Sequence, residues 1–141
     1  MDTNVLVSAA LTHSGRPAEV LGLILDDRIE LVVDDRVLDE YRRVLMRSEL
    51  DITREEAEVI LDYLDRQSHR VQCLPSPAPL PHQADECFLA AAAAGKAAFL
   101  ITANTRLFPP GVFGDVRVAT PAEFLAAYVR IKHGPGSPDL D

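Results

Sequence analysis

Apolar residues along the chain follow two kinds of spacing, and each predicts a different element. Spacings of three and four residues predict helices over about residues 17–27, 35–47, 53–68, 85–94 and 121–133. Short apolar runs predict strands over residues 29–33, 70–74, 98–102 and 116–120. Local signals mark the boundaries: N-caps at Asp34 or Asp35 and at Asp85, a T-x-x-E capping box at Thr53, and a helix end at Gly95.

The predicted strands alternate with helices, and they are apolar throughout instead of at every second residue. That pattern indicates an α/β fold in which a mostly parallel sheet is buried by helices on both faces. In such sheets ligands bind at the carboxyl ends of the strands. The same pattern requires one more strand ahead of Asp2, where only Met1 stands. We therefore expect the first strand of the sheet to be truncated.

The size and composition of the chain fit one soluble domain over residues 1–132, followed by a disordered tail over residues 133–141. The chain has 141 residues, of which 48% are hydrophobic and 26% charged, as in ordinary globular proteins. Four prolines between residues 75 and 82 exclude regular structure there. The sequence has neither a signal peptide nor the roughly 20 apolar residues of a membrane span. We expect a cytoplasmic protein.

The charge of the chain narrows the classes of function. A net charge of −8 argues against adhesion to nucleic acid through lysines and arginines. An acidic surface can instead be a set of carboxylates that bind divalent cations, whose charge reverses the field that a phosphate meets. Cys73 and Cys87 lack metal-binding spacing, and we interpret both as buried apolar residues.

Short polar side chains gather at the predicted carboxyl edge of the sheet: Asp2, Asp34, Asp35, Asp85, Thr102 and Asn104. Glu40 lies in the helix after strand 29–33 and can point back over the same edge. Carboxylates of Asp2, Glu40 and Asp85 in one pocket would repel one another unless a cation joined them. Oxygen ligands without imidazole or thiolate suit Mg²⁺ or Mn²⁺. Such a site fits phosphodiester hydrolysis.

Each of these residues also has a simpler interpretation. Asp2 can cap the apolar run behind it as the start of a helix. Glu40 and Asp85 each have an acidic neighbour, Asp39 and Glu86, that could take the role instead. Asn104 can stabilise a turn. The residues alone leave these alternatives open.

Six segments in order resemble the PIN-domain family: DTNVLVSA (2–9), GRPAEVL (15–21), LDEYRRVL (38–45), DECFLAAA (85–92), FLITANTRLFPP (99–110) and VRVATPAEFL (116–125). The similarity is greatest to the branch that contains the toxin components of toxin–antitoxin pairs. It covers roughly residues 2 to 128, and no single segment would carry it alone.

The resemblance implies a three-layer α/β/α sandwich with a mostly parallel sheet and a Mg²⁺- or Mn²⁺-dependent ribonuclease site. The four site positions of the family fall on Asp2, Glu40, Asp85 and Asn104. Asn104 is neutral where many members have Asp, so it implies weaker binding of a second metal ion. The resemblance further implies an RNA substrate, a cognate antitoxin protein and a homodimer.

Two other classes of function remain as alternatives. One is a catalytically weak or inactive PIN-like module that binds RNA or protein, which the neutral Asn104 and the truncated strand suggest. The other is a nuclease that acts on structured DNA.

Overall fold

The computed structural model describes residues 1–72, 75, 83–108 and 115–132. These residues form helices α1 (Thr3–Thr12), α2 (Gly15–Leu25), α3 (Asp35–Leu45), α4 (Arg54–Gln67), α5 (Gln83–Ala94) and α6 (Pro121–Lys132), a 3-10 helix η1 (Thr105–Leu107), and strands β1 (Val32–Val33), β2 (His69–Arg70), β3 (Phe99–Ile101) and β4 (Arg117–Ala119). The predicted tail, most of the proline-rich segment and Cys73 lie outside the described residues.

The structure confirms two of the helix N-caps that were predicted from the sequence. The Asp34 carboxylate accepts a hydrogen bond from the Val37 N–H at 2.9 Å, and the Thr53 hydroxyl accepts one from the Glu56 N–H at 3.2 Å. The prediction that Asp85 is an N-cap is wrong, because α5 already begins at Gln83 and Asp85 lies in its first turn.

Two predicted strands differ from the observed ones. The run 29–33 forms a strand only over Val32–Val33, because the Ile29 N–H turns back to the Leu23 carbonyl at 3.4 Å and closes the end of α2. The strand expected over residues 70–74 is β2, which begins one residue earlier, at His69, and includes only residues 69 and 70.

The strands pair in parallel, as predicted for an α/β fold. β1 pairs with β2 and β3 with β4, so the described strands form two separate pairs. Between the pairs lies the start of the chain, where the Asp2 N–H donates to the Ile101 carbonyl at 2.9 Å. This bond extends the open edge of β3 toward β1.

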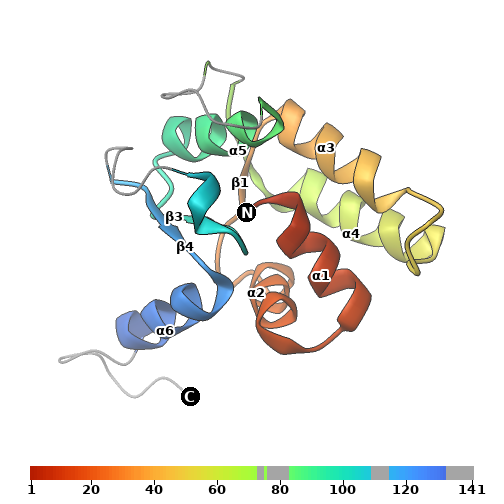
Figure 1. Cartoon of the computed structure of the whole chain (residues 1–141), viewed down its shortest axis with the longest axis horizontal. Helices are drawn as coiled ribbons and strands as arrows, with labels where there is room; N and C mark the ends of the chain where they lie inside the picture. Colours follow the sequence, from red (N-terminus) through yellow and green to blue (C-terminus); the bar gives the residue numbers. More distant parts are fainter. Residues whose placement is uncertain (73–74, 76–82, 109–114, 133–141) are drawn as a thin grey trace.

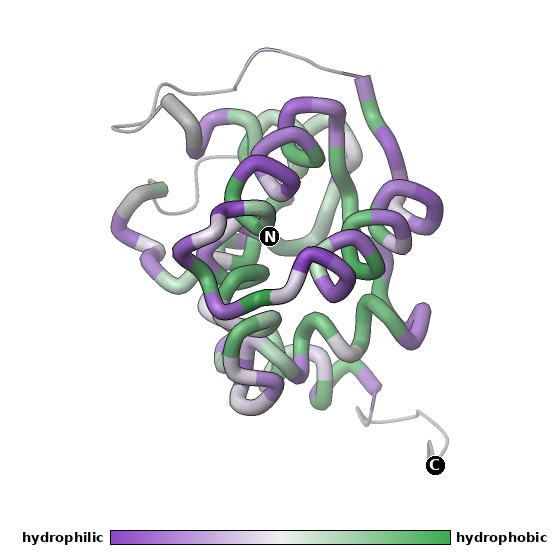
Figure 2. The backbone as a smooth tube through the Cα atoms, turned by 90° about the vertical axis from the view of Figure 1, so that its right-hand side faces the viewer, coloured by the Kyte–Doolittle hydropathy of each residue, from purple (hydrophilic) through white to green (hydrophobic). Residues whose placement is uncertain are grey.

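Helices cover the strand pairs. α5 packs against β1 and β3, while α6 packs against β3, β4 and α2 (Figure 1). Hydrophobic segments face the interior and hydrophilic ones lie mainly on the outer helices (Figure 2). The largest fully buried side chains include residues of α1, α3, α4, α5 and β3, together with Phe108 just after η1: Tyr41, Phe108, Leu6, Leu45, Leu61, Leu64, Leu89 and Leu100. In the described part of the chain, no helix is long and apolar enough to cross a membrane.

Tyr41 ties α3 to the first residue of the chain. Its side chain is fully buried, its hydroxyl donates to the Met1 carbonyl at 2.5 Å, and its ring stacks on Phe88 at 6.0 Å between centroids. Burial, reinforced by the charge of Asp2, raises the pKa of the Tyr41 phenol well above its usual value. The hydroxyl therefore stays a hydrogen-bond donor.

We expect Tyr41→Phe to lower the free energy of unfolding by about 1–3 kcal/mol, because it leaves the buried Met1 carbonyl without its partner. Urea denaturation measures the change. Tyr63→Phe is the control, since the Tyr63 hydroxyl bonds to Asp27 at the exposed surface. Equal losses for the two variants would contradict the assigned role of the buried hydrogen bond.

Candidate active site

One pocket brings three of the predicted acids together. It has a volume of about 110 Å³ and is lined by Asp2, Thr3, Asn4, Glu40, Asp85 and Phe88. These residues come from the start of α1, from α3 and from α5, which are far apart in the sequence. Asp39 and Glu86, the alternative acids, are not among the lining residues. We call this the acid pocket.

Asp2 both caps a helix and lines the acid pocket. One carboxylate oxygen accepts a hydrogen bond from the Val5 N–H at 3.0 Å, which makes Asp2 the N-cap of α1. The other oxygen accepts one from the Thr102 hydroxyl. The side chain is 5% exposed. The two interpretations of Asp2 are therefore compatible, because the same residue caps α1 and lines the acid pocket.

Asn104 is not brought to the acid pocket. Its side-chain oxygen accepts a hydrogen bond from the Arg106 N–H at 3.2 Å and caps η1. Asn104 therefore stabilises a turn, which is one of the two interpretations of this residue given above. Its backbone N–H donates to the Thr102 hydroxyl at 3.1 Å, so Asn104 reaches Asp2 only through Thr102. The exposed Asn104 side chain stands apart from the three acids.

Glu40 is held by an arginine on its own helix. Arg43 donates to both carboxylate oxygens, at 2.7 Å from Nη2 and 3.2 Å from Nε. The pair is partly open to solvent, with 57% of the Arg43 side chain and 21% of the Glu40 side chain exposed. This ion pair was not predicted from the sequence, although the three-residue spacing of Glu40 and Arg43 on a helix indicates it.

Asp34 and Asp35, expected at the same edge, have other partners. Asp34 is fully buried and accepts from the Val37 N–H and from Arg36, the latter at 2.9 Å. Asp35 is exposed and pairs with Arg70 at 3.4 Å. Both carboxylates lie at the start of α3 and bind these neighbouring partners. Neither lines the acid pocket.

The acid pocket contains oxygen atoms that could bind a metal ion, but its carboxylates are not grouped closely enough to form a metal site. Among the described residues, no three Asp, Glu, His or Cys side chains are arranged to hold a metal ion. Thr3 Oγ1, however, is buried in the pocket wall and has no hydrogen-bond partner, whereas buried polar atoms normally have one. The donor set suits Mg²⁺ or Mn²⁺, and the Arg43 guanidinium, which donates to both Glu40 oxygens, would compete with such an ion for that carboxylate.

The pKa of Cys87, on α5 near the acid pocket, is affected by the negative charges around that pocket. Burial raises the pKa of the Cys87 thiol to about 12, and the charges of Asp34, Glu40 and Asp85 add to the shift while Arg36 opposes it. The thiol is therefore protonated at neutral pH. Cys87 is half-buried instead of fully buried as predicted, and the prediction for Cys73 falls outside the described residues.

The structure is that of an α/β protein in which helices cover parallel strand pairs. An acidic pocket lies beyond the end of β3. The chain belongs to the PIN-domain family: a family model described as PIN domain matches residues 1–106. PIN domains are generally nucleases, which are hydrolases. No curated protein and no solved structure matches the chain significantly.

We expect Cys87 to react with iodoacetamide at pH 8 about a thousandfold more slowly than an unperturbed cysteine, since only the thiolate attacks. Mass spectrometry of a Cys73→Ser variant follows this one thiol. The reaction rate should rise with pH over the range in which the protein stays folded. The urea-unfolded protein, in which Cys87 is exposed, gives the reference rate. If the folded protein reacts at that same rate, the raised pKa of Cys87 is wrong.

Proposed function

We propose that the chain is a metal-dependent endoribonuclease that hydrolyses RNA phosphodiester bonds, and that it is the toxin of a toxin–antitoxin pair. The observation that carries this proposal is the meeting of Asp2, Glu40 and Asp85 in one pocket of a PIN domain. These carboxylates would hold Mg²⁺ or Mn²⁺. Such an ion activates water and offsets charge on the phosphate.

The protein's own residues would orient the acids. Thr102, fully buried, fixes one oxygen of Asp2 through its hydroxyl, and the first turn of α1 fixes the other. Asp2 is therefore rigid before any ligand binds, which favours a defined position for a cation. Asn104 would act on the site through Thr102 instead of as a fourth ligand.

The family resemblance implies a cognate antitoxin protein as partner, and the charge of the chain indicates the kind of segment that would bind. The acidic pocket and the net charge of −8 favour a basic antitoxin segment that covers the pocket and competes for its carboxylates. A homodimer, which the family resemblance implies, and a cytoplasmic location, expected from the sequence, complete the proposal.

We expect Asp85→Asn to cut RNA about 100-fold more slowly than the unchanged chain in Mn²⁺, equivalent to losing about 2.7 kcal/mol of transition-state stabilisation. Asp39→Asn is the matched control, because Asp39 is an exposed acid outside the acid pocket. Labelled RNA and structured DNA are assayed in parallel. Equal cleavage of RNA by the two variants would refute the assignment, and cleavage of DNA alone would replace RNA as the substrate.

The ion pair of Glu40 and Arg43 favours a second candidate, a PIN-like module that binds RNA or protein without cutting it. In that case the acid pocket remains closed to cations by Arg43. Calorimetry with millimolar Mn²⁺ separates the two, since a module of this kind takes up no metal ion.

We expect Arg43→Gln to tighten Mn²⁺ binding about two- to fivefold, because a partly exposed ion pair that competes with the cation contributes up to about 1 kcal/mol. Titration calorimetry gives the dissociation constant without any need for catalysis. Arg42→Gln removes the same charge from the neighbouring position as a control. If both variants shift the constant equally, Arg43 acts only through net charge.

A further inference from the structure

Two side-chain oxygens in the described part of the chain are buried without a hydrogen-bond partner: Thr3 Oγ1 and Ser68 Oγ. Such atoms are rare, because burying a hydroxyl without a partner costs free energy. Ser68 is the C-cap of α4 and is not among the residues that line the acid pocket. Thr3 is the first residue of α1 and does line it. Of the two hydroxyls, only that of Thr3 therefore belongs to the wall of the acid pocket.

The first turn of α1 holds Thr3 beside the first acid. Thr3 directly follows Asp2, whose carboxylate caps α1 by accepting a hydrogen bond from the Val5 N–H at 3.0 Å. Thr3 is 7% exposed, and a β-branched side chain in a helix has few accessible rotamers. The Thr3 hydroxyl is therefore held in place before any ligand binds.

The other buried hydroxyl next to Asp2 is already bonded. Thr102 donates to the Asp2 carboxylate and accepts a hydrogen bond from the Asn104 N–H at 3.1 Å. A hydroxyl has one donor and two acceptor positions. Thr102 has used its donor and one acceptor position within the protein, whereas Thr3 Oγ1 has no partner among the described residues. Thr3 is therefore the hydroxyl of the pocket that a ligand can satisfy.

The acid pocket has room for water between its carboxylates. Its volume of about 110 Å³ is enough for several water molecules. Asp2, Glu40 and Asp85 line it, yet within the described ranges no three such side chains are arranged to contact one ion directly. Mg²⁺ gives up its water reluctantly and usually keeps several water molecules when it binds to a protein. Water on the ion can therefore bridge the space between the ion and the polar groups of the pocket.

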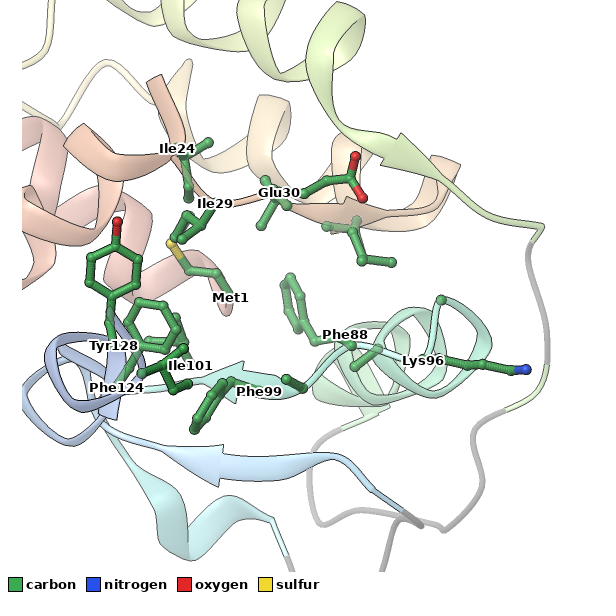
Figure 3. A pocket seen from close by; sticks show the side chains of 18 residues that line it. Met1, Ile24, Ile29, Glu30, Phe88, Lys96, Phe99, Ile101, Phe124 and Tyr128 are labelled. Atoms are coloured by element: carbon green, nitrogen blue, oxygen red, sulfur yellow. The ribbon is translucent and has the colours of Figure 1, made fainter. Parts of the chain in front are cut away.

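A larger cavity of about 380 Å³ differs from the acid pocket in chemistry. Its lining is mostly apolar and includes Met1, Phe99 and Phe124 (Figure 3). Phe88 lines both cavities and so gives the acid pocket one apolar wall. A hydrogen bond beside such a wall is stronger than one in bulk water. The acid pocket, and not the larger cavity, is therefore suited to a hydrated ion.

We propose that the Thr3 hydroxyl is the fourth polar group of the acid pocket and binds a water molecule in the hydration shell of a divalent cation. Asp2, Glu40 and Asp85 supply the negative charge that attracts the ion, and Thr3 orients its water as a positioning residue. This inference rests on the proposed function, because it requires the same cation. It gives Thr3 a role that the family position at Asn104 does not fill here, since the Asn104 side chain caps η1.

The test compares Thr3→Val, which keeps the shape of the side chain without its hydroxyl, with Thr3→Ser, which keeps the hydroxyl. Titration calorimetry of the full chain gives the dissociation constant of Mn²⁺. We expect Thr3→Val to weaken Mn²⁺ binding about three- to tenfold, as the loss of one hydrogen bond does, and Thr3→Ser to bind as tightly as the unchanged chain. Without Mn²⁺, we expect Thr3→Val to raise Tm by about 2–4 °C, because it removes a buried hydroxyl that lacks a partner.

Ser68→Ala is the matched control, because it removes the other unpartnered hydroxyl at a position outside the acid pocket. It should leave Mn²⁺ binding unchanged. The inference is overturned if Thr3→Val binds Mn²⁺ as tightly as the unchanged chain, if Ser68→Ala weakens binding equally, or if Thr3→Val lowers Tm in the absence of the metal ion. If the unchanged chain takes up no Mn²⁺, the proposed function fails together with this inference. If Mn²⁺ binds to the variants in the expected order and no RNA is cut, only the assignment as a ribonuclease fails.

Discussion

The hydrogen bonds around Asp2 are the interactions on which the rest of the structure depends. Its carboxylate joins the first turn of α1 to Thr102 at the end of β3, and its backbone N–H adds a bond to the edge of β3. One residue earlier, the Met1 carbonyl accepts from Tyr41 of α3. Two consecutive residues therefore connect three elements that are distant in sequence. A carboxylate with both oxygens bonded in this way is fixed in space, as the proposed role of Asp2 requires.

The acid pocket shows how a fold can keep carboxylates together before a cation is present. Like charges in a small volume raise one another's free energy unless they have partners. Here Asp2 is neutralised in part by hydrogen bonds, and Glu40 by the guanidinium of Arg43. The pair with Arg43 is partly exposed and hence weak, so under the proposed function a divalent cation would displace the arginine at modest cost. The two carboxylates thus differ in kind: Asp2 is fixed, and Glu40 is exchangeable.

The sequence predicted the caps of two helices, but it did not predict which of several backbone partners a residue takes where more than one is within reach. Thr53 and Asp34 cap their helices as expected because a cap needs only residues within one turn. The lengths of the strands could not be read from apolar runs, since Ile29 is apolar but is drawn into the turn after α2. Asn104 was assigned to the site by family position, yet its side chain bonds two residues ahead to Arg106. Short polar side chains often choose such nearby backbone partners.

Phe88 lies between two cavities. It lines the acid pocket and a larger, mostly apolar cavity of about 380 Å³, and its ring stacks on Tyr41, whose hydroxyl donates to the Met1 carbonyl. Met1 lines the larger cavity, while Asp2, its neighbour, lines the acid pocket. Because packed interiors transmit displacements instead of absorbing them, a change in packing around Met1 reaches the acid pocket through Phe88 and the Met1–Asp2 peptide.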